Sequence, residues 1–411
     1  MQWRWIILIT SLIISVLTLK FTQNLGTRTP LKTSGELQSH QLISDTGSGI
    51  KIAVCSLLSA RKSSLRNGPL VQNIVNELSE ETHVVILVND LEAFQHTGNA
   101  DRVTFLKLPE ASHLSIWPQD PFLILEGSGT PKMVVSKKFD RGDDLIMAEQ
   151  LSSQLDLEII ETDLHFEGGN IVCSNEKIFI GRDTVSRNMA DLGANEGQII
   201  RRFEKLLGAS VQIVGTTPQP IGHIDLIVTP LGEKVISVAD SNLGAEIVQE
   251  VLDQSPREIL RFIEECENDF FGSDQIESVT DLAGNQLVRP NLKDGLQHAI
   301  QYSRELSSDL DAIASDLQKQ GFRIVRAPAL VSNLEGKEIR FPILTYNNVL
   351  LETRNEQNIV YLPQYGLNTL DQAACTHWES LGYLVKPVEG FATSAMYGGS
   401  LRCCTKVLLR D

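Results

Sequence analysis

The pattern of apolar and polar positions repeats along the chain from residue 50 onward. Each unit has a polar or glycine-rich opening, a hairpin of two short apolar strands, an amphipathic helix and a further apolar strand. Complete hairpins are predicted at 121–137, 171–181, 226–240 and 349–363. A fifth hairpin begins with LRCCTKVLL, close to the C-terminus. The repetition indicates one architecture built from similar units.

The remaining elements follow the same order in each unit. Helical periodicity is predicted at 68–80, 143–155, 194–207 and 368–381, with a longer helical region at 243–320. Apolar strands follow at 83–88, 157–161, 211–215, 322–328 and 383–389. Because the spacing is irregular, a closed ring with insertions is favoured over a simple solenoid. The strand at 51–58 would complete the unit that the C-terminal hairpin starts, and this closure would leave no exposed sheet edge.

The domain boundaries follow from this pattern. We expect one α/β catalytic domain over 50–411, in which 243–320 is a helical insertion that serves as a spacer or as a lid. Residues 21–49 are rich in Thr, Ser, Gln and Gly and are predicted to be a linker.

The first twenty residues carry an apolar run from Trp5 to Leu19 between Arg4 and Lys20. This length matches the core of a signal peptide and is short for a full membrane span. No small-residue cleavage site follows, so 1–20 is predicted to be an uncleaved signal anchor rather than a cleaved signal peptide. The expected location is exported or membrane-anchored rather than cytoplasmic.

Composition narrows the class of partner. The formal net charge is −16, from 52 acidic against 36 basic residues. This balance argues against nucleic acid, which binds mainly through Lys and Arg, and is compatible with a cationic small molecule. The six cysteines show neither CxxC spacing nor zinc-ligand spacing with His, so no metal and no cofactor are expected.

The openings of the units carry the residues that could do chemistry. If the units are radially equivalent, these openings meet at one end of the ring and bring together Asp120, Glu167, His223, Asp225, Asn348 and Cys403. Each of them alone has an ordinary structural explanation as a cap, a turn or a core residue. Together they offer a thiol nucleophile, an acid/base histidine and several carboxylates. Acyl transfer requires only one carboxylate, to orient the histidine. Several carboxylates instead suit a planar guanidinium, which pairs with them through its forked N–H groups.

Four short motifs carry a resemblance to a known family. WPQD (117–120), EGGN (167–170), GHID (222–225) and GGSLRCCT (398–405) resemble, in the same order, motifs of the guanidino-group-modifying (pentein) superfamily. The agmatine deiminase and protein-arginine deiminase branch is the most similar. The resemblance implies a five-bladed, pseudo-symmetric α/β propeller, here with a helical insertion and an N-terminal hydrophobic anchor.

The resemblance also implies roles for individual residues. Asp120 and Asp225 would hold the guanidinium nitrogens while Cys403 attacks the central carbon. His223 would protonate the departing ammonia and then deprotonate the hydrolytic water, and Glu167 would orient His223. Cys403 rather than Cys404 matches the family nucleophile, because Thr405 stands two residues after it. Further substrate-binding positions are expected at Trp117, Asn348, Gly399 and Arg402.

Two departures from the family pattern affect the substrate more than the chemistry. Arg402 stands where the family commonly has His, and Gln119 stands where agmatine deiminases usually have Arg. Arg402 could lower the pKa of the thiol or could bind a substrate carboxylate. The predicted activity is a deiminase that releases ammonia from agmatine or peptidyl-arginine. The alternatives are an amidinotransferase with the same site and a catalytically inactive pentein binding protein; the sequence does not indicate an oligomeric state.

Overall fold

The computed structural model describes most of the chain from residue 40 to its C-terminus. The described residues are 40–57, 67–88, 100–109, 112, 114–127, 130–232, 234–271, 278–280, 286–288, 292–333 and 341–411. The predicted signal segment 1–20 lies outside them and stays a prediction. Among the described residues, no helix has the length and the apolar content needed to cross a bilayer.

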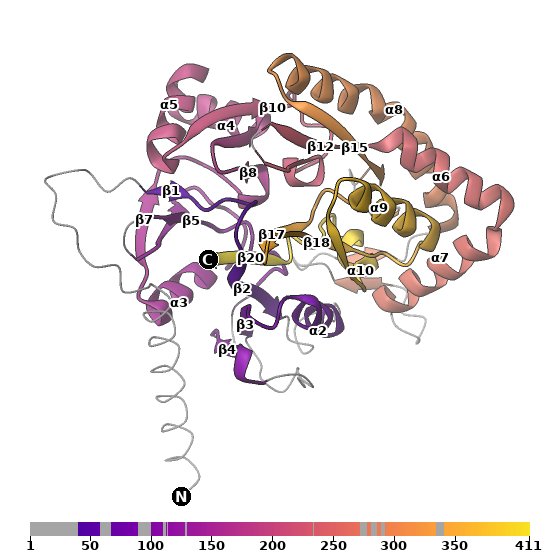
Figure 1. Ribbon diagram of the computed structural model, residues 1–411, viewed down its shortest axis with the longest axis horizontal. Helices are drawn as coiled ribbons and strands as arrows, with labels where there is room; N and C mark the ends of the chain where they lie inside the picture. Colours follow the sequence, from indigo (N-terminus) through magenta and orange to yellow (C-terminus); the bar gives the residue numbers. More distant parts are fainter. Residues whose placement is uncertain are drawn as a thin grey trace, which may run out of the picture.

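Five sheets in the described part of the chain lie around a common centre (Figure 1). The first contains β1 (Gln41–Leu42), β5 (Phe122–Glu126), β6 (Lys132–Ser136) and β7 (Glu158–Thr162). The second contains β8 (Ile171–Cys173), β9 (Lys177–Gly181) and β10 (Ser210–Val214). The third contains β11 (Val228–Pro230), β12 (Val235–Asp240), β15 (Arg323–Leu330) and β16 (Leu344–Thr345). The fourth contains β17 (Leu350–Arg354), β18 (Gln357–Pro363) and β19 (Leu384–Val388). The fifth contains β20 (Thr405–Arg410), β2 (Ile50–Leu57), β3 (His83–Val88) and β4 (Val103–Lys107).

Helices and short helical turns connect these strands. The α-helices are α2 (Gly68–Glu77), α3 (Leu145–Leu155), α4 (Arg182–Leu192), α5 (Glu196–Leu207), α6 (Ser241–Gln254), α7 (Pro256–Phe271), α8 (Leu292–Lys319), α9 (Asn368–Ser380) and α10 (Ala392–Met396). The 3₁₀ turns are η2 (Ala100–Arg102), η3 (Gly168–Asn170) and η4 (Ile224–Leu226). A small hairpin of β13 (Ser278–Thr280) and β14 (Gln286–Val288) lies between α7 and α8 in the chain.

The sheets share the predicted order of a hairpin followed by a parallel strand. In the first sheet β5 and β6 are antiparallel and β7 is parallel to β6. The same pattern holds for β8, β9 and β10, for β11, β12 and β15, and for β17, β18 and β19. In the fifth sheet the hairpin partner comes from the other end of the chain, because β20 pairs antiparallel with β2. The predicted pairing of the two end strands in one sheet is therefore confirmed.

Helix α5 illustrates how the local sequence sets an element. Asn195 accepts a hydrogen bond from the backbone of Gln198, whose side chain binds the Asn195 backbone in return, so the helix begins with a capping box. Ile199, Phe203 and Leu207 recur at helical spacing and are fully buried. The helix ends at Gly208, which has a positive φ of 77°.

Helix α4 was not predicted, since the predicted helix covered only 194–207. Its sequence RDTVSRNMADL is polar, and Thr184, Val185 and Asn188 are its buried positions. Two of these three are polar, which weakens the apolar periodicity on which the prediction depended.

The long region between β12 and β15 contains α6, α7 and α8, as the periodicity indicated. It also contains the β13–β14 hairpin, which was not predicted. Helices α6 and α8 pack on β15 and on each other, while α7 packs on α10. Helix α10 ends shortly before Gly398–Gly399, so α7 packs against the helix that leads into this part of the candidate site. Whether it is an inserted lid or a spacer stays a prediction.

The described end of the predicted linker 21–49 packs on the body of the protein. Strand β1 pairs with β5, and the backbone of Ile43 continues that pairing to Ile124 at 2.9 Å. Asp45 accepts a hydrogen bond of 2.7 Å from the backbone of Cys173 in the second sheet. Residues 40–49 thus differ from a solvated linker, because they bridge separate sheets.

Candidate active site

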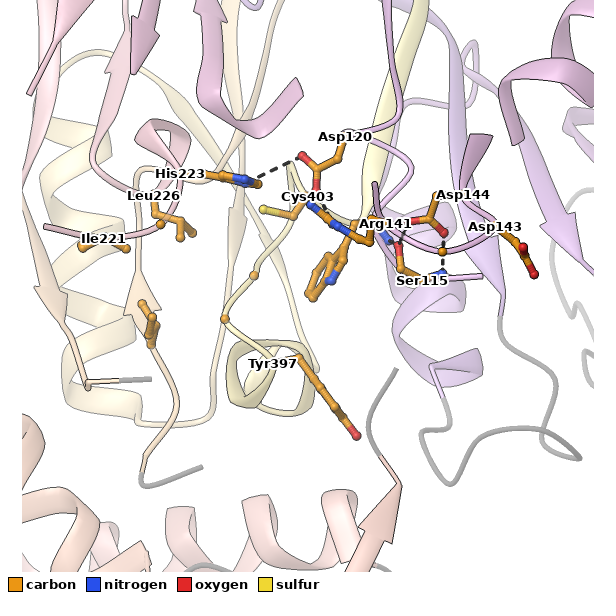
Figure 2. Close-up of a pocket in the computed structure, with 16 residues that line it drawn as sticks. Ser115, Asp120, Arg141, Asp143, Asp144, Ile221, His223, Leu226, Tyr397 and Cys403 are labelled. Atoms are coloured by element: carbon orange, nitrogen blue, oxygen red, sulfur yellow. Dashed lines mark hydrogen bonds and ion pairs between the residues drawn. The ribbon is translucent and has the colours of Figure 1, made fainter. Parts of the chain in front are cut away.

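A cavity of about 740 Å³ lies where the polar segments that begin the repeated units meet (Figure 2). Of the predicted site residues, Trp117, Asp120, His223, Gly399 and Cys403 line it. The other predicted residues are Glu167, Asp225, Asn348 and Arg402. The first three each contact His223 or Cys403, whereas Arg402 contacts Asp225. The structure therefore brings the predicted residues together around one cavity, although they enter it to different depths.

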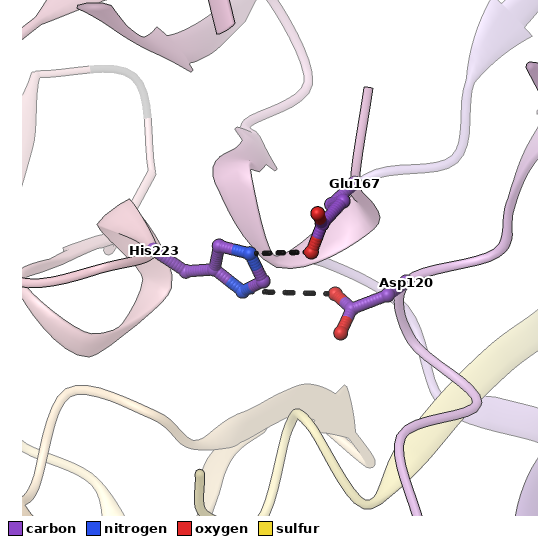
Figure 3. A group of neighbouring side chains, drawn as sticks. All are labelled: Asp120, Glu167 and His223. Carbon is purple, nitrogen blue, oxygen red and sulfur yellow. Dashed lines mark hydrogen bonds and ion pairs between the residues drawn. The ribbon is translucent and has the colours of Figure 1, made fainter. Parts of the chain in front are cut away.

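His223 stands between two carboxylates (Figure 3). Its Nε2 lies 2.9 Å from Oε2 of Glu167, and its Nδ1 lies 3.7 Å from Oδ1 of Asp120. Burial works against protonation, but the two carboxylates outweigh it and raise the pKa of His223 to about 9. Burial likewise opposes the charge of Glu167, yet its hydrogen bond to His223 lowers the pKa of Glu167 to about 2. The pair is therefore an imidazolium and a carboxylate at neutral pH.

The local backbone explains why these side chains meet. Glu167 and His223 each have extended backbone angles and each directly precede a 3₁₀ turn, η3 or η4. The shared position reflects the repeated unit predicted from the sequence. Gly169, in η3, donates its N–H to Oδ1 of Asp120 at 2.8 Å. A Cβ on Gly169 would lie 2.4 Å from Nδ1 of His223, so a larger residue would push the cluster apart.

Cys403 is buried at the bottom of the C-terminal opening. Asn348 holds it from two sides: its Nδ2 lies 3.3 Å from Sγ, and its Oδ1 accepts the Cys403 backbone N–H at 3.1 Å. The Sγ atom lies 3.8 Å from Oδ2 of Asp225. Burial first, and then the charges of Asp225 and Asp120, raise the pKa of the thiol well above its ordinary value. At neutral pH Cys403 is therefore a thiol rather than a thiolate.

Trp117 and Gly399 form a wall of the cavity. A Cβ on Gly399 would lie 2.5 Å from the Trp117 ring, so only glycine allows the C-terminal opening to approach the indole this closely. Gly398, beside it, has a φ of 83°, which also favours glycine. The two glycines of this motif therefore set the distance between the Cys403 segment and the wall.

Asp225 is fully buried and its two oxygens have different surroundings. Its Oδ2 accepts a hydrogen bond of 2.9 Å from Nη1 of Arg402. Its Oδ1 is buried and has no hydrogen-bond partner among the described residues. Burial raises the pKa of Asp225 against the opposing charges of Arg402 and His223. Asp225 lies beside Cys403 through Oδ2, and its other oxygen, buried and without a partner among the described residues, can accept a hydrogen bond from a cationic donor.

Arg402 lies behind the cavity rather than in it. Its guanidinium is bonded to Asp225, to both oxygens of Asp45 and to the backbone carbonyl of Ile171. The geometry thus does not provide the direct substrate contact that the sequence suggested for Arg402. Nor does the thiol of Cys403 have a lowered pKa in this arrangement. Arg402 instead connects Asp225 to the packed end of the predicted linker.

Two residues of the site escaped the sequence reasoning. Arg141 lines the cavity and donates from Nη1 to Oδ2 of Asp120 at 2.7 Å, while its Nη2 donates to Glu167. It belongs to the charged run DRGDD (140–144), whose composition is typical of a surface turn. Asp45 lay in the predicted linker. Neither residue stands in an opening of the repeat, which was the one signal available.

One group of side chains has the distances of a metal site. The ligand atoms of Asp120, Glu167 and His223 lie within 4.8 Å of one another. Arg141 donates to both carboxylates of this group, so a positive charge is already supplied there by the chain itself. The expectation that the protein uses no metal stays a prediction.

The fold can be compared with those of known proteins. No family model matches the chain, and a search of curated proteins finds no match either. Among solved structures, the chain is similar to the agmatine deiminase of C. jejuni, with a TM-score of 0.60 and 14% identity over 92% of this chain and 99% of that one. It is also similar to the agmatine deiminase of Enterococcus faecalis, with a TM-score of 0.58 and 12% identity over 90% and 96%. At the level of the fold, the resemblance predicted from four short motifs is confirmed: the chain folds as agmatine deiminases do.

Proposed function

We propose that the protein is a thiol-dependent amidine hydrolase that removes ammonia from a guanidinium substrate of the agmatine or peptidyl-arginine type. The observation that carries the proposal is the cavity lined by Cys403, His223 and Asp120, with Glu167 paired to His223 and Asp225 beside Cys403. The shared fold supports it. In keeping with that fold, we interpret the five sheets as the blades of a five-bladed α/β propeller.

Binding would begin with charge pairing. A planar guanidinium between Asp120 and Asp225 can donate to Oδ1 of Asp225, which has no partner among the described residues. The bound cation would also offset the two negative charges that raise the pKa of the Cys403 thiol. Substrate binding and thiol ionisation are therefore coupled, and the nucleophile forms where its target lies.

Attack and hydrolysis would then follow in two steps. As the substrate binds, the Cys403 thiol loses its proton to water and the thiolate Sγ bonds to the central guanidinium carbon. The protonated His223 then gives its proton to the departing nitrogen, which leaves as ammonia. This leaves a covalent amidino-thioether and a neutral His223. His223 next takes a proton from water, whose oxygen attacks the same carbon. The C–S bond breaks, releasing a urea derivative and restoring the thiolate, while His223 is again protonated.

The acceptor distinguishes the hydrolase from the alternative enzyme. An amidinotransferase would use the same thiol, histidine and carboxylates, but an amine would replace water in the second step. A binding protein would show neither step. The names of the similar solved structures favour water as the acceptor, and the substrate tail is open between a free amine and a peptide.

The test is ammonia release from agmatine, peptidyl-arginine and free arginine, with reductant present, by the wild-type protein. Cys403→Ser should reduce the rate by roughly 10⁴-fold or more, as for other covalent catalysts. Cys404→Ser is the matched control: this neighbouring thiol is also buried but does not line the cavity, so activity should persist. Ammonia release by Cys403→Ser at the wild-type rate would overturn the mechanism. Turnover that requires an added amine would establish the amidinotransferase instead.

The location of the enzyme rests on sequence only. We retain the proposal that residues 1–20 direct it to export or to membrane anchoring. Fractionation of cells that express the full chain, beside a chain that starts at residue 30, tests this. Equal recovery of both chains in the soluble cytoplasmic fraction would refute it.

A further inference from the structure

The segment between β6 and α3, residues 137–144, brings a cation of the chain itself into the cavity. Arg141 and Asp144 from this segment line the cavity, and Arg141 extends toward Asp120 (Figure 2). Its guanidinium bridges Asp120 and Glu167. The chemical group that the proposed substrate would present is therefore already found there, as part of the protein.

The two oxygens of Asp120 are both engaged in this structure. Oδ1 accepts the backbone N–H of Gly169 at 2.8 Å, and Oδ2 accepts Nη1 of Arg141 at 2.7 Å. The backbone contact is part of the fold, whereas the departure of Arg141 would free Oδ2 for an incoming guanidinium. Asp225 differs, because its Oδ1 has no partner among the described residues. Asp225 thus has an oxygen without a hydrogen-bond donor among the described residues, whereas Oδ2 of Asp120 is already paired with Arg141.

We propose that Arg141 is an internal competitor for the guanidinium subsite, and that its departure from Asp120 sets the apparent affinity for substrate. The substrate assignment in this proposal rests on the proposed function; the competition itself requires only a guanidinium ligand. Arg141 is thus a specificity-determining residue. A ligand that cannot offer the same forked donors would not displace it.

The surroundings of Arg141 allow it to leave. Its side chain is 31% exposed, so water can solvate the guanidinium once it moves away. The next residue, Gly142, has a φ of 46°, a backbone state that glycine adopts readily. The ring of Phe139 lies 5.8 Å from the Arg141 guanidinium carbon and offers it an aromatic face outside the carboxylate pair.

The test is the binding of guanidinium ion by calorimetry, in a Cys403→Ser background so that no turnover interferes. Arg141→Gln should bind guanidinium about tenfold more tightly than its parent, because the competing state is gone. Lys138→Gln is the matched control: it removes a positive charge from the same segment, but its side chain pairs with Asp191 on the surface. This variant should bind as the parent does.

Several outcomes would overturn the inference. Binding to Arg141→Gln that is equal to or weaker than binding to the parent, including no binding to either, would show that Arg141 is not a competitor. If Arg141→Gln does not fold, a crystal structure of the parent with guanidinium decides. Arg141 must then have left Oδ2 of Asp120; a bound guanidinium beside an intact Arg141–Asp120 pair contradicts the proposal.

The same data separate this inference from the proposed function. If the wild type releases ammonia but Arg141→Gln binds guanidinium no more tightly than its parent, the proposed deiminase activity holds and Arg141 is not a competitor. Tighter binding in Arg141→Gln, with no ammonia released from any guanidino substrate, would keep the competitor and remove the deiminase.

Discussion

Two arginines face the two carboxylates of the candidate site, and they do so differently. Arg402 pairs with Asp225 and its side chain is 9% exposed, whereas Arg141 pairs with Asp120 and its side chain is 31% exposed. Arg402 is also bonded to Asp45 and to backbone carbonyls, so its fork is surrounded by acceptors. The side chain of Arg141 ends at two carboxylates beside an open cavity.

The difference shows that burial decides what an ion pair can do. A buried pair with matched hydrogen bonds is costly to break, because separation leaves an uncompensated charge in the interior. Arg402 therefore acts as a fixed support that leaves one oxygen of Asp225 for a ligand. Arg141 is partly exposed although its partner Asp120 is buried, so water can solvate the arginine when the pair separates and the cost is lower. Arg141 can therefore be a temporary occupant.

The largest expected effect comes from the buried arginine. Arg402→Met should lower the free energy of unfolding by about 3–5 kcal/mol, since Asp225 and Asp45 lose their common partner inside the protein. Urea denaturation measures this. Arg141→Gln, the same loss of charge at a partly exposed arginine, should lower the unfolding free energy by less than Arg402→Met does, because water reaches the Arg141 side chain. If both variants lose the same free energy of unfolding, Arg402 is not a more firmly held structural residue than Arg141.

A pH-dependent effect of intermediate size is expected from the His223–Glu167 pair. The pKa of His223 rises from 6.5 to about 9 on folding, so its contribution to stability is fully present below pH 6.5 and is lost as the pH rises through 9. The pKa of Glu167 falls from 4.5 to about 2, so its contribution is fully present above pH 4.5 and is lost as the pH falls through 2. The pair should stabilise the fold most between these limits, by roughly 2–3 kcal/mol in total. The two shifts are not added, because both include the His223–Glu167 interaction.

The measurement compares the wild type with His223→Gln by urea denaturation at about pH 6 and about pH 9.5. The difference in unfolding free energy between the two proteins should shrink at the higher pH. Arg141 is protonated at both pH values, so its contact with Glu167 cannot produce the change. If the difference in unfolding free energy is the same at both pH values, His223 keeps its ordinary pKa in the folded protein.

The smallest effect is expected at the far end of the buried network. Asp45→Asn should lower the free energy of unfolding by about 1–2 kcal/mol, because Asn can still accept one hydrogen bond from Arg402 or from Cys173. Activity should fall less than in Asp225→Asn, which removes the negative charge proposed to pair with the guanidinium. Steady-state kinetics of both variants test the order. If Asp45→Asn loses more activity than Asp225→Asn, Asp45 has a role in the reaction beyond holding Arg402 in place.

The sequence allowed much of the fold to be predicted, because the signals involved are local. Strand β3 was predicted at 83–88, where it is found, and β7, β10 and β19 lie within a residue or so of their predicted ranges. Alternating or continuous apolar runs bounded by turn residues carry this information within a few positions. Helix α4 shows the limit, since its buried face is largely polar.

The candidate site was predictable to the extent that its residues stand in the repeated openings. Asp120, His223 and Cys403 line one cavity, and Asn348 and Glu167 hold the thiol and the imidazole. Arg141 and Asp45 could not be found in this way. Arg141 lies between a strand and a helix, and Asp45 precedes the first unit.

The sequence by itself determined the order of strands and helices, and the thiol, base and acids that the openings present. Only the tertiary structure decided which arginine meets which carboxylate, and at what depth. Asp45 and Arg402 are 357 residues apart, yet their pairing fixes the support behind Asp225. The charge of a side chain can be read from its letter, whereas the dielectric around it and the identity of its partner are properties of the packed interior.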